Sequence, residues 1–275
     1  MSNDPQRMDV LSFSCVHLSI AVVVEFQYFR SLVSVSSDSV AVSFQMSNIA
    51  FTRIQRECKE VVTNKEIAET GIMIEILNDS LSEIKGQIRG PPDTPYQGGS
   101  FDLEIKIPDT YPFTPPKHFL WLKRSLPYQG LMNFNTQLLP LVRTLFQIKF
   151  LTKIWHPNIS SQTGTICLDI LKDQWAASLT LRTVLLSIQA LMCSPEPKDP
   201  QDAVVAKQYM SNPSLFKETA IFWTIKYAKG KAEENPQYRE HVEKLRDMGV
   251  TEDEAISVLS CSNWDLAKAT DYIFS

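Results

Sequence analysis

Residues 155–170 read WHPNISSQTGTICLDI, and the rest of the chain is best interpreted outward from this stretch. Proline fixes its own φ and disfavours a helical conformation for the residue before it, so residues 156–158 predict a stiff turn. Cys167 follows shortly after, beyond a polar turn at residues 160–165 that contains a glycine. A stiff turn that ends in an amide, followed closely by a thiol, could form a reaction centre. The alternative is an inert, buried cysteine beside a structural turn.

The composition is ordinary for a globular protein, with 44% hydrophobic and 21% charged residues in a chain of 275. This length suits one large domain, or a medium domain with a small one. The net charge is −4 and there is no long basic run, so neither nucleic acid nor a membrane is expected as a partner.

The cysteines and histidines do not form a metal-binding pattern. Five cysteines, at positions 15, 58, 167, 193 and 261, contain no CxxC pair, which argues against a disulfide framework and against a zinc site. Four histidines, at positions 17, 118, 156 and 241, lack HExxH or similar spacing. We expect no metal, a reducing compartment, and a cytoplasmic or also nuclear location.

Two segments differ from their surroundings. In residues 1–45, the apolar run of residues 10–24 is shorter than the ~20 residues of a spanning helix and lacks the basic flank of a secretory signal. This segment is either an atypical extension or not native coding sequence, with the true start at Met46. Residues 118–147 carry Leu, Phe and Trp throughout, which is unusual for a long loop. We predict an insertion there, or a misread intron, with a short amphipathic helix over residues 138–146 as the structured alternative.

Periodicity predicts an α+β arrangement between these segments. A helix is expected from Ser47, with Ile49, Ile54, Val61 and Val62 on its apolar side. Four strands are predicted at residues 72–77, 84–88, 101–107 and 148–155. Because the first three are joined by short links, they should form an antiparallel meander.

The second half of the chain is predicted to be helical. Helices are expected at residues 181–192, with Thr180 as N-cap, and at residues 202–210 and 213–228. Residues 230–236 form a polar linker. Three short helical patterns then follow, at residues 237–247, 253–261 and 266–274, and a unit of this size is typical of a binding module.

Several motifs together resemble one family. They are the His-Pro-Asn turn at residues 156–158, GTICLDIL at 164–171, Trp175, GPPDTPYQGG at 90–99 and YPFTPPK at 111–117. With these motifs, residues 46–229 resemble the catalytic domain of the ubiquitin-conjugating enzymes, apart from the insert at 118–147. Residues 237–275 resemble a ubiquitin-associated (UBA) domain, which some members carry.

The resemblance implies a fold and an activity. The fold is α+β, a four-stranded antiparallel sheet flanked by helices, plus a small three-helix UBA domain. Cys167 would accept ubiquitin from the activating enzyme as a thioester and pass it to a lysine, building polyubiquitin chains that direct proteins to the proteasome. The family's reaction needs no metal or small cofactor in this enzyme.

The resemblance also implies roles around Cys167. Asn158 would stabilise the oxyanion or order the loop around it, and capping of its own turn is the structural alternative. Asp199 matches an acidic residue that orients the acceptor lysine, although Lys198 stands where related enzymes often carry another acid; Asp199 could instead cap the helix that begins near residue 202. His156 and Pro157 are expected to be structural, and a role of His156 as a catalytic base is the less favoured alternative.

Partner-binding residues carry over by position. Arg53 and Arg56 match a basic face that meets the activating enzyme, with a solvated helix face as the alternative. Phe113, Ala176 and Ala177 match the contact for ubiquitin ligases, expected to be of the RING type, although the usual Ser-Pro after Trp175 is absent. In the small domain, the turn that contacts ubiquitin has the sequence Met-Gly-Phe in the family, and it is matched here by Met248, Gly249 and Val250. Valine in place of the aromatic removes apolar area from that contact.

Two other functions compete with this one. A non-catalytic ubiquitin-binding protein would result if the insert at 118–147 blocks the fold or the surface for the activating enzyme. The retention of Cys167, Asn158 and Asp199 argues against it. A cysteine protease is poorly supported, because no second histidine or asparagine completes a protease arrangement.

Overall fold

The structure is a computed structural model that describes residues 48–108, 110–113, 147–172 and 174–275. The predictions for residues 1–45, for Met46 as the start, for Ser47 as the first residue of a helix and for the segment 118–146 lie outside these residues. Among the described residues, no helix combines the length and apolar character that crossing a membrane requires.

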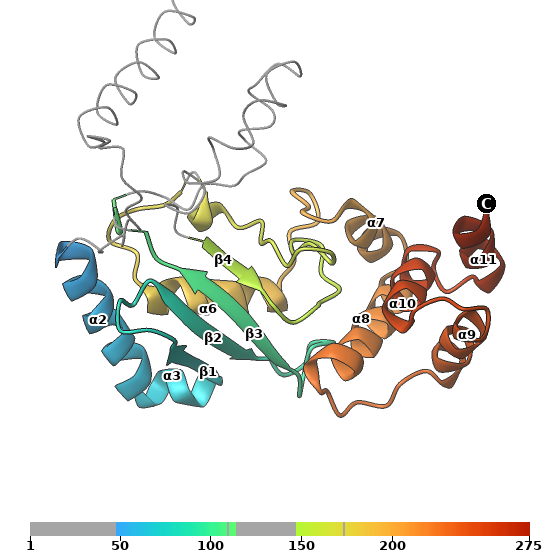
Figure 1. The fold of residues 1–275 in the computed structure, drawn as a ribbon, viewed down its shortest axis with the longest axis horizontal. Helices are drawn as coiled ribbons and strands as arrows, with labels where there is room; N and C mark the ends of the chain where they lie inside the picture. The colour runs from blue at the N-terminus through green and yellow to red at the C-terminus, as the bar shows by residue number, and fades with distance from the viewer. Residues whose placement is uncertain (1–47, 109, 114–146, 173) are drawn as a thin grey trace, which may run out of the picture. The chain divides into compact units, whose positions relative to one another are not determined.

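A four-stranded sheet lies at the centre of the part of the chain between residues 48 and 228. Its strands follow the chain order and each neighbouring pair is antiparallel, which confirms the predicted meander (Figure 1). The strands are β1 (Ile72–Ile76), β2 (Glu83–Arg89), β3 (Ser100–Lys106) and β4 (Gln147–Phe150). In β3 the buried Phe101, Leu103 and Ile105 alternate with half-buried polar residues, as the period of two requires.

The fourth strand is shorter than predicted. It ends at Phe150, so the expectation of a strand through residue 155 was wrong for its second half. The backbone N–H groups of Leu151 and Thr152 both donate to the carbonyl oxygen of Asp102, and the Thr152 hydroxyl accepts from the Asp102 N–H at 2.9 Å. A side chain thus replaces the next backbone partner, and the chain leaves the ladder toward the His-Pro-Asn turn.

Among the described residues between 48 and 228, five helices accompany the sheet. They are α2 (Asn48–Thr63), α3 (Lys65–Thr70), α6 (Leu181–Cys193), α7 (Ala203–Ser211) and α8 (Pro213–Ala228). Thr180 caps α6 as predicted, accepting from the Thr183 N–H. The short α3 was not predicted; Asn64 caps its start, and Gly71, at φ +78°, ends it in a left-handed conformation.

The apolar side of α2 was predicted only in part. Ile54 and Val61 are buried, but Ile49 and Val62 are exposed by 66% and 63%. The buried stripe runs instead through Ala50, Ile54 and Cys58, which are spaced four residues apart and therefore lie on one face of the helix.

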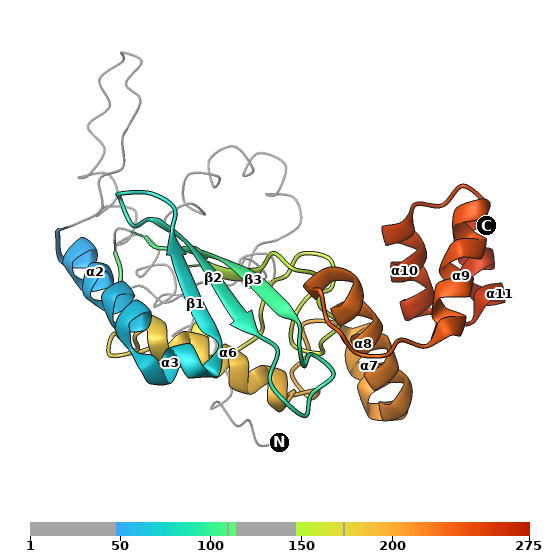
Figure 2. The ribbon, with the colours of Figure 1, turned by 90° about the horizontal axis from the view of Figure 1, so that it is seen from below.

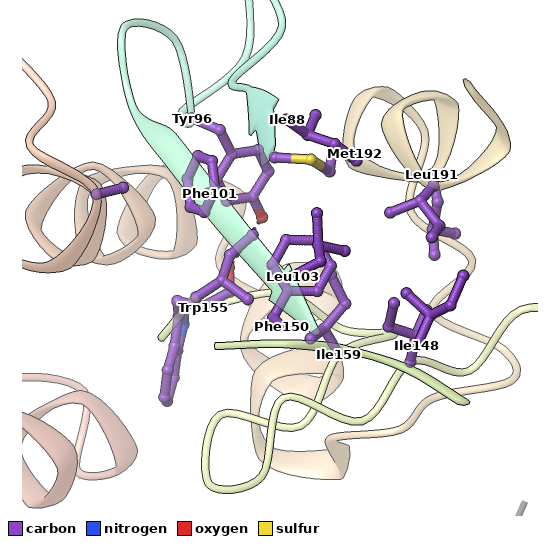
Figure 3. Close-up of a cluster of buried hydrophobic side chains, with 14 of the residues drawn as sticks. Ile88, Tyr96, Phe101, Leu103, Ile148, Phe150, Trp155, Ile159, Leu191 and Met192 are labelled. Carbon is purple, nitrogen blue, oxygen red and sulfur yellow. Dashed lines mark hydrogen bonds between the residues drawn. The ribbon is translucent and has the colours of Figure 1, made fainter. Parts of the chain in front are cut away.

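Helix α6 covers one face of the sheet, and α2 lies beside β1 (Figure 2). Leu191 and Met192, near the end of α6, point toward Ile88, Leu103 and Phe150 of three different strands (Figure 3). All five side chains are buried. The position of α6 therefore fixes the loop that follows it, at residues 194–202.

Three further helices follow α8: α9 (Pro236–Asp247), α10 (Glu252–Cys261) and α11 (Leu266–Phe274). The Trp264 ring stacks on Tyr238 at 3.8 Å, and its indole N–H donates to the Thr219 hydroxyl of α8 at 2.9 Å. The indole of Trp223 in α8 donates to the Ser260 hydroxyl at 2.9 Å. Buried tryptophans with paired N–H groups thus attach this three-helix unit to α8.

Glu57 is a buried carboxylate that connects three elements. Its oxygens accept hydrogen bonds from Arg53 Nε at 2.7 Å, from the Tyr111 hydroxyl at 2.7 Å and from the Leu181 N–H at 2.8 Å. The side chain is only 2% exposed. It therefore holds α2, the segment around Tyr111 and the start of α6 in one arrangement.

Replacing Glu57 should destabilise the protein. We expect Glu57→Leu to lower the free energy of unfolding by about 3 kcal/mol, because the buried carboxylate accepts three hydrogen bonds and a leucine side chain accepts none. Glu57→Gln, which keeps an acceptor, should cost less. The control is Glu60→Gln, which breaks a surface pair with Arg182 and should cost about 1 kcal/mol or less. Urea unfolding measures all three, and equal losses for Glu57→Leu and Glu60→Gln would contradict this role.

Candidate active site

The imidazole of His156 is fully buried and has both nitrogens engaged. Its Nδ1 accepts from the Asn158 N–H at 2.9 Å, which places the ring proton on Nε2, where it donates to the Leu191 carbonyl at 3.0 Å. Burial lowers the pKa of His156 from 6.5 to about 4. A neutral ring whose two nitrogens both take part in hydrogen bonds has no free site for a substrate proton. This geometry favours the predicted scaffold role.

The side chain of Asn158 joins the turn to the loop after α6. Its Nδ2 donates to the carbonyls of Glu196 at 2.9 Å and Asp199 at 3.0 Å, while its Oδ1 accepts from the Glu196 N–H at 2.8 Å. The residue is 1% exposed. Both amide hydrogens are therefore committed to the loop, which favours loop ordering over direct stabilisation of an oxyanion, and over capping of its own turn.

Backbone contacts complete this junction. The Pro157 carbonyl accepts from the N–H groups of Gln201 and Asp202, and the Cys167 N–H donates to the Asn158 carbonyl at 2.7 Å. Asp202 caps α7 by accepting from the Val205 N–H, so Asp199 is not needed as that cap.

A glycine allows the strand residues and the turn to meet. Gly164 has φ +72°, and an added Cβ would overlap the carbonyl oxygen of Phe150. Its own carbonyl accepts from the Phe150 N–H at 2.9 Å. Any larger residue would push the turn away from β4 and move Cys167 with it.

The Cys167 thiol lies between a cation and an anion. Its Sγ is 2.7 Å from Lys172 Nζ and 3.2 Å from Asp199 Oδ2, and the two charged groups are 3.6 Å apart. Cys167 is 5% exposed, whereas the Asp199 side chain is 81% exposed. The sulfur is therefore sheltered, and the carboxylate beside it faces solvent.

Opposing effects act on the pKa of the Cys167 thiol. Burial raises it most, the hydrogen bond from Lys172 lowers it, and Asp199 raises it, with a net increase. The pKa of Lys172 is raised, because its hydrogen bond to the sulfur and the nearby carboxylate outweigh its own partial burial. Lys172 was missed in the sequence, since it follows the predicted motif and reads as an ordinary surface lysine.

The two arginines of α2 differ in their surroundings. Arg53 donates to Glu57 and to the Leu179 carbonyl at 3.1 Å, and its guanidinium lies 5.6 Å from the centre of the Tyr111 ring. Arg56 is exposed. A basic face for a partner would therefore depend on Arg56 more than on Arg53.

The predicted ligase contact is brought together in space. Phe113 is 71% exposed, and the indole N–H of Trp175 donates to the carbonyl of the adjacent Pro112 at 2.8 Å. Ala176, which follows Trp175, is exposed, and Ala177 is half-buried. One hydrogen bond thus links the two segments that carry these residues.

The turn after α9 exposes only part of the predicted ubiquitin contact. Met248 is 53% exposed and Gly249 has φ +92°, but Val250 is 8% exposed. Because Val250 is buried, the surface that this turn presents to a partner comes mainly from Met248.

Comparison with known proteins agrees with this geometry. A family model described as "Ubiquitin-conjugating enzyme" matches residues 53–124 and 144–224, more than half of the chain. The chain therefore belongs to the ubiquitin-conjugating enzyme family, whose members are ubiquitin transferases. The unmatched residues 125–143 lie inside the segment predicted as an insert, whose boundaries stay a prediction.

Individual relatives extend the match beyond the family model. "Ubiquitin-conjugating enzyme E2-22 kDa" of Drosophila melanogaster is 51% identical over 230 residues, 84% of this chain and 100% of the relative. "Ubiquitin-conjugating enzyme E2 21" of Caenorhabditis elegans is 50% identical over 232 residues, 84% of this chain and 94% of the relative. "Ubiquitin-conjugating enzyme E2 K" of Homo sapiens is 48% identical over 230 residues, with 84% and 100% covered.

A solved structure supports the fold as well. The crystal structure of a Plasmodium yoelii protein described as a ubiquitin conjugating enzyme is 43% identical, with a TM-score of 0.52. It covers 68% of this chain and 100% of that chain. The predicted α+β fold with a four-stranded antiparallel sheet is thus confirmed, while the UBA identity of residues 237–275 stays a prediction.

The buried His156 should make stability pH-dependent. Its pKa of about 4 is below the value of about 6.5 in an unfolded chain, so the unfolded state binds the proton first and stability falls as pH drops below 6.5. We expect this residue to account for a loss of about 2 kcal/mol between pH 7 and pH 5. Urea unfolding of wild type and His156→Gln at both pH values measures it.

The control for this experiment is Thr180→Ala, which removes the cap of α6 but no titratable group and should keep the wild-type pH dependence. An equal loss between pH 7 and pH 5 in wild type and His156→Gln would contradict the assignment.

Proposed function

We propose that this ubiquitin-conjugating enzyme carries ubiquitin as a thioester on Cys167 and transfers it to a lysine amine. The observation that carries the proposal is the position of the Cys167 sulfur, sheltered from solvent and within 3.2 Å of the exposed Asp199 carboxylate. Cys58, by contrast, is buried in the helical core at 2% exposure, where burial raises its pKa to about 11.

The proposed charging step exchanges one thioester for another. The Cys167 thiolate attacks the carbonyl carbon at the end of ubiquitin, forming a new C–S bond and breaking the bond to the sulfur of the activating enzyme. That enzyme's thiolate leaves and takes up a proton, while the Cys167 proton has already gone to solvent. The thiolate is the nucleophile, so the pKa of Cys167 governs the rate.

The proposed transfer step joins the carbonyl to an amine. An incoming lysine ammonium loses one proton to solvent, and its amine nitrogen attacks the thioester carbon, forming a C–N bond. The C–S bond then breaks with Cys167 leaving as the thiolate, and the nitrogen gives up a second proton to solvent, which leaves an amide. Asp199 can accept a hydrogen bond from the approaching ammonium, because its carboxylate faces solvent beside the sulfur. Asn158 holds the backbone of Asp199 in place, and we assign it this positioning role.

The proposed partners are ubiquitin, the activating enzyme and RING-type ligases. The exposed Phe113 and Ala176 form an apolar surface suited to a ligase, and Arg56 supplies positive charge for the activating enzyme. The three-helix unit is proposed to act as a UBA domain that binds ubiquitin through Met248. Together these features suit an enzyme that extends degradative polyubiquitin chains in the cytoplasm, and also in the nucleus.

The test of the function is a charging assay with activating enzyme, ubiquitin and ATP. We expect a conjugate that disappears on treatment with a thiol reductant and is absent in Cys167→Ala. The control is Cys193→Ala, which removes an exposed cysteine and should charge like wild type. A conjugate that persists in Cys167→Ala would contradict the proposal.

The rival function, a ubiquitin-binding protein without activity, depends on the segment at 118–147. The same assay separates the two when the full chain is compared with a version that lacks this segment. Charging of both chains supports the enzyme. Charging of the shortened chain alone supports a block by the insert.

A further inference from the structure

We propose that Lys172 is a catalytic residue for the charging step, because its ammonium stabilises the thiolate of Cys167. The inference rests on the proposed function of Cys167 as the ubiquitin carrier. Lys172 contacts the reacting atom itself, with 2.7 Å between Nζ and Sγ.

A short turn brings the lysine back to the cysteine. The 3-10 helix η2 (Asp169–Leu171) reverses the chain, with the Leu171 N–H donating to the Leu168 carbonyl at 3.0 Å and the Lys172 N–H to the Asp169 carbonyl at 2.9 Å. Leu171 is buried and anchors this turn. The lysine stem therefore starts close to the thiol, and its side chain is only 26% exposed.

The charged groups that act on the sulfur come from two sides. Lys172 approaches from the turn and Asp199 from the loop after α6. Among the described residues, the charged groups that act on the pKa of the Cys167 thiol are Lys172 and Asp199, and His156 in the preceding turn is neutral at physiological pH. Within this part of the chain, Lys172 is therefore the cation that offsets both burial and the Asp199 carboxylate.

This arrangement matches what charging requires. A sheltered thiol beside a carboxylate would by itself hold its proton at neutral pH, since both burial and the negative charge disfavour a thiolate. A nearby ammonium restores part of the thiolate population, and the thiolate is the species that attacks. After acylation the sulfur carries no charge, so Lys172 is left facing Asp199 alone.

The experiment measures the rate of alkylation of Cys167 by iodoacetamide between pH 6 and pH 11. The extent of reaction is read by mass spectrometry on the peptide that contains Cys167, so the other cysteines do not interfere. In Lys172→Met we expect the midpoint of the plot of alkylation rate against pH to rise by about one pH unit. Alkylation at neutral pH should then be about tenfold slower than in wild type. Lys172→Arg keeps the charge and should lie between wild type and Lys172→Met.

Two further variants separate charge from loosened structure. Asp199→Asn removes the opposing charge and should lower the midpoint, whereas general loosening would move both variants the same way. Lys198→Met removes an exposed lysine next to Asp199 and should leave the midpoint within about 0.3 units of wild type, since distant charges are screened. An unchanged midpoint in Lys172→Met, or an equal rise in Lys198→Met, would overturn the proposal.

The charging assay gives the second readout. Single-turnover charging of Lys172→Met should be about tenfold slower at neutral pH and should recover as the pH is raised, in parallel with the alkylation profile. If wild type is charged and Lys172→Met changes neither pH profile, the role of Lys172 is overturned and the proposed function still stands. Absence of charging in wild type would instead refute the function.

Discussion

The candidate active site depends on one buried amide. The Asn158 side chain makes three hydrogen bonds across to the loop after α6, two as donor to the carbonyls of Glu196 and Asp199 and one as acceptor from the Glu196 N–H. An amide side chain is suited to this position because it combines an acceptor oxygen with two N–H donors. Since Asn158 is 1% exposed, each partner left unpaired would cost about 1–3 kcal/mol. These three hydrogen bonds therefore determine where the Asp199 carboxylate lies relative to Cys167.

The surrounding elements hold the His-Pro-Asn turn, and with it Asn158, from both sides. His156 anchors the turn to the end of α6 through the Leu191 carbonyl, and burial of α6 against three strands fixes that end. Trp155, just before the turn, donates from its indole N–H to Gln208 of α7 at 2.7 Å, and Gln208 donates in turn to the Asn263 side chain of the C-terminal unit at 2.9 Å. The Cys167 thiol thus lies beside a turn that is hydrogen-bonded to α6 and α7, while its charged neighbours Lys172 and Asp199 are carried by a short turn and a loop.

The sequence was informative where periodicity or a local motif carried the signal. The alternation in β3 and the proline at the start of α8 predicted elements that the structure confirms, and the His-Pro-Asn and GTICLDIL motifs identified the family. The end of β4 was missed, because it depends on a Thr152 side chain replacing a backbone partner across the sheet. Glu57 reads as a solvated helix residue, and only the tertiary fold brings Tyr111 and Leu181 to it. Lys172 was missed for a similar reason, since its contact with Cys167 depends on the path of a single 3-10 turn.

The most direct test of the positioning role of Asn158 is a double-mutant cycle on the transfer step. Enzyme already charged with ubiquitin is mixed with free lysine, and loss of the thioester is followed in wild type, Asn158→Ala, Asp199→Asn and the double variant. If Asn158 acts by positioning Asp199, each single variant should slow discharge and the double variant should be no slower than the slower single variant, because the two residues act as one unit. If the two reductions in discharge rate instead multiply in the double variant, Asn158 acts on the reaction independently of Asp199. That result would contradict its role in positioning the Asp199 carboxylate.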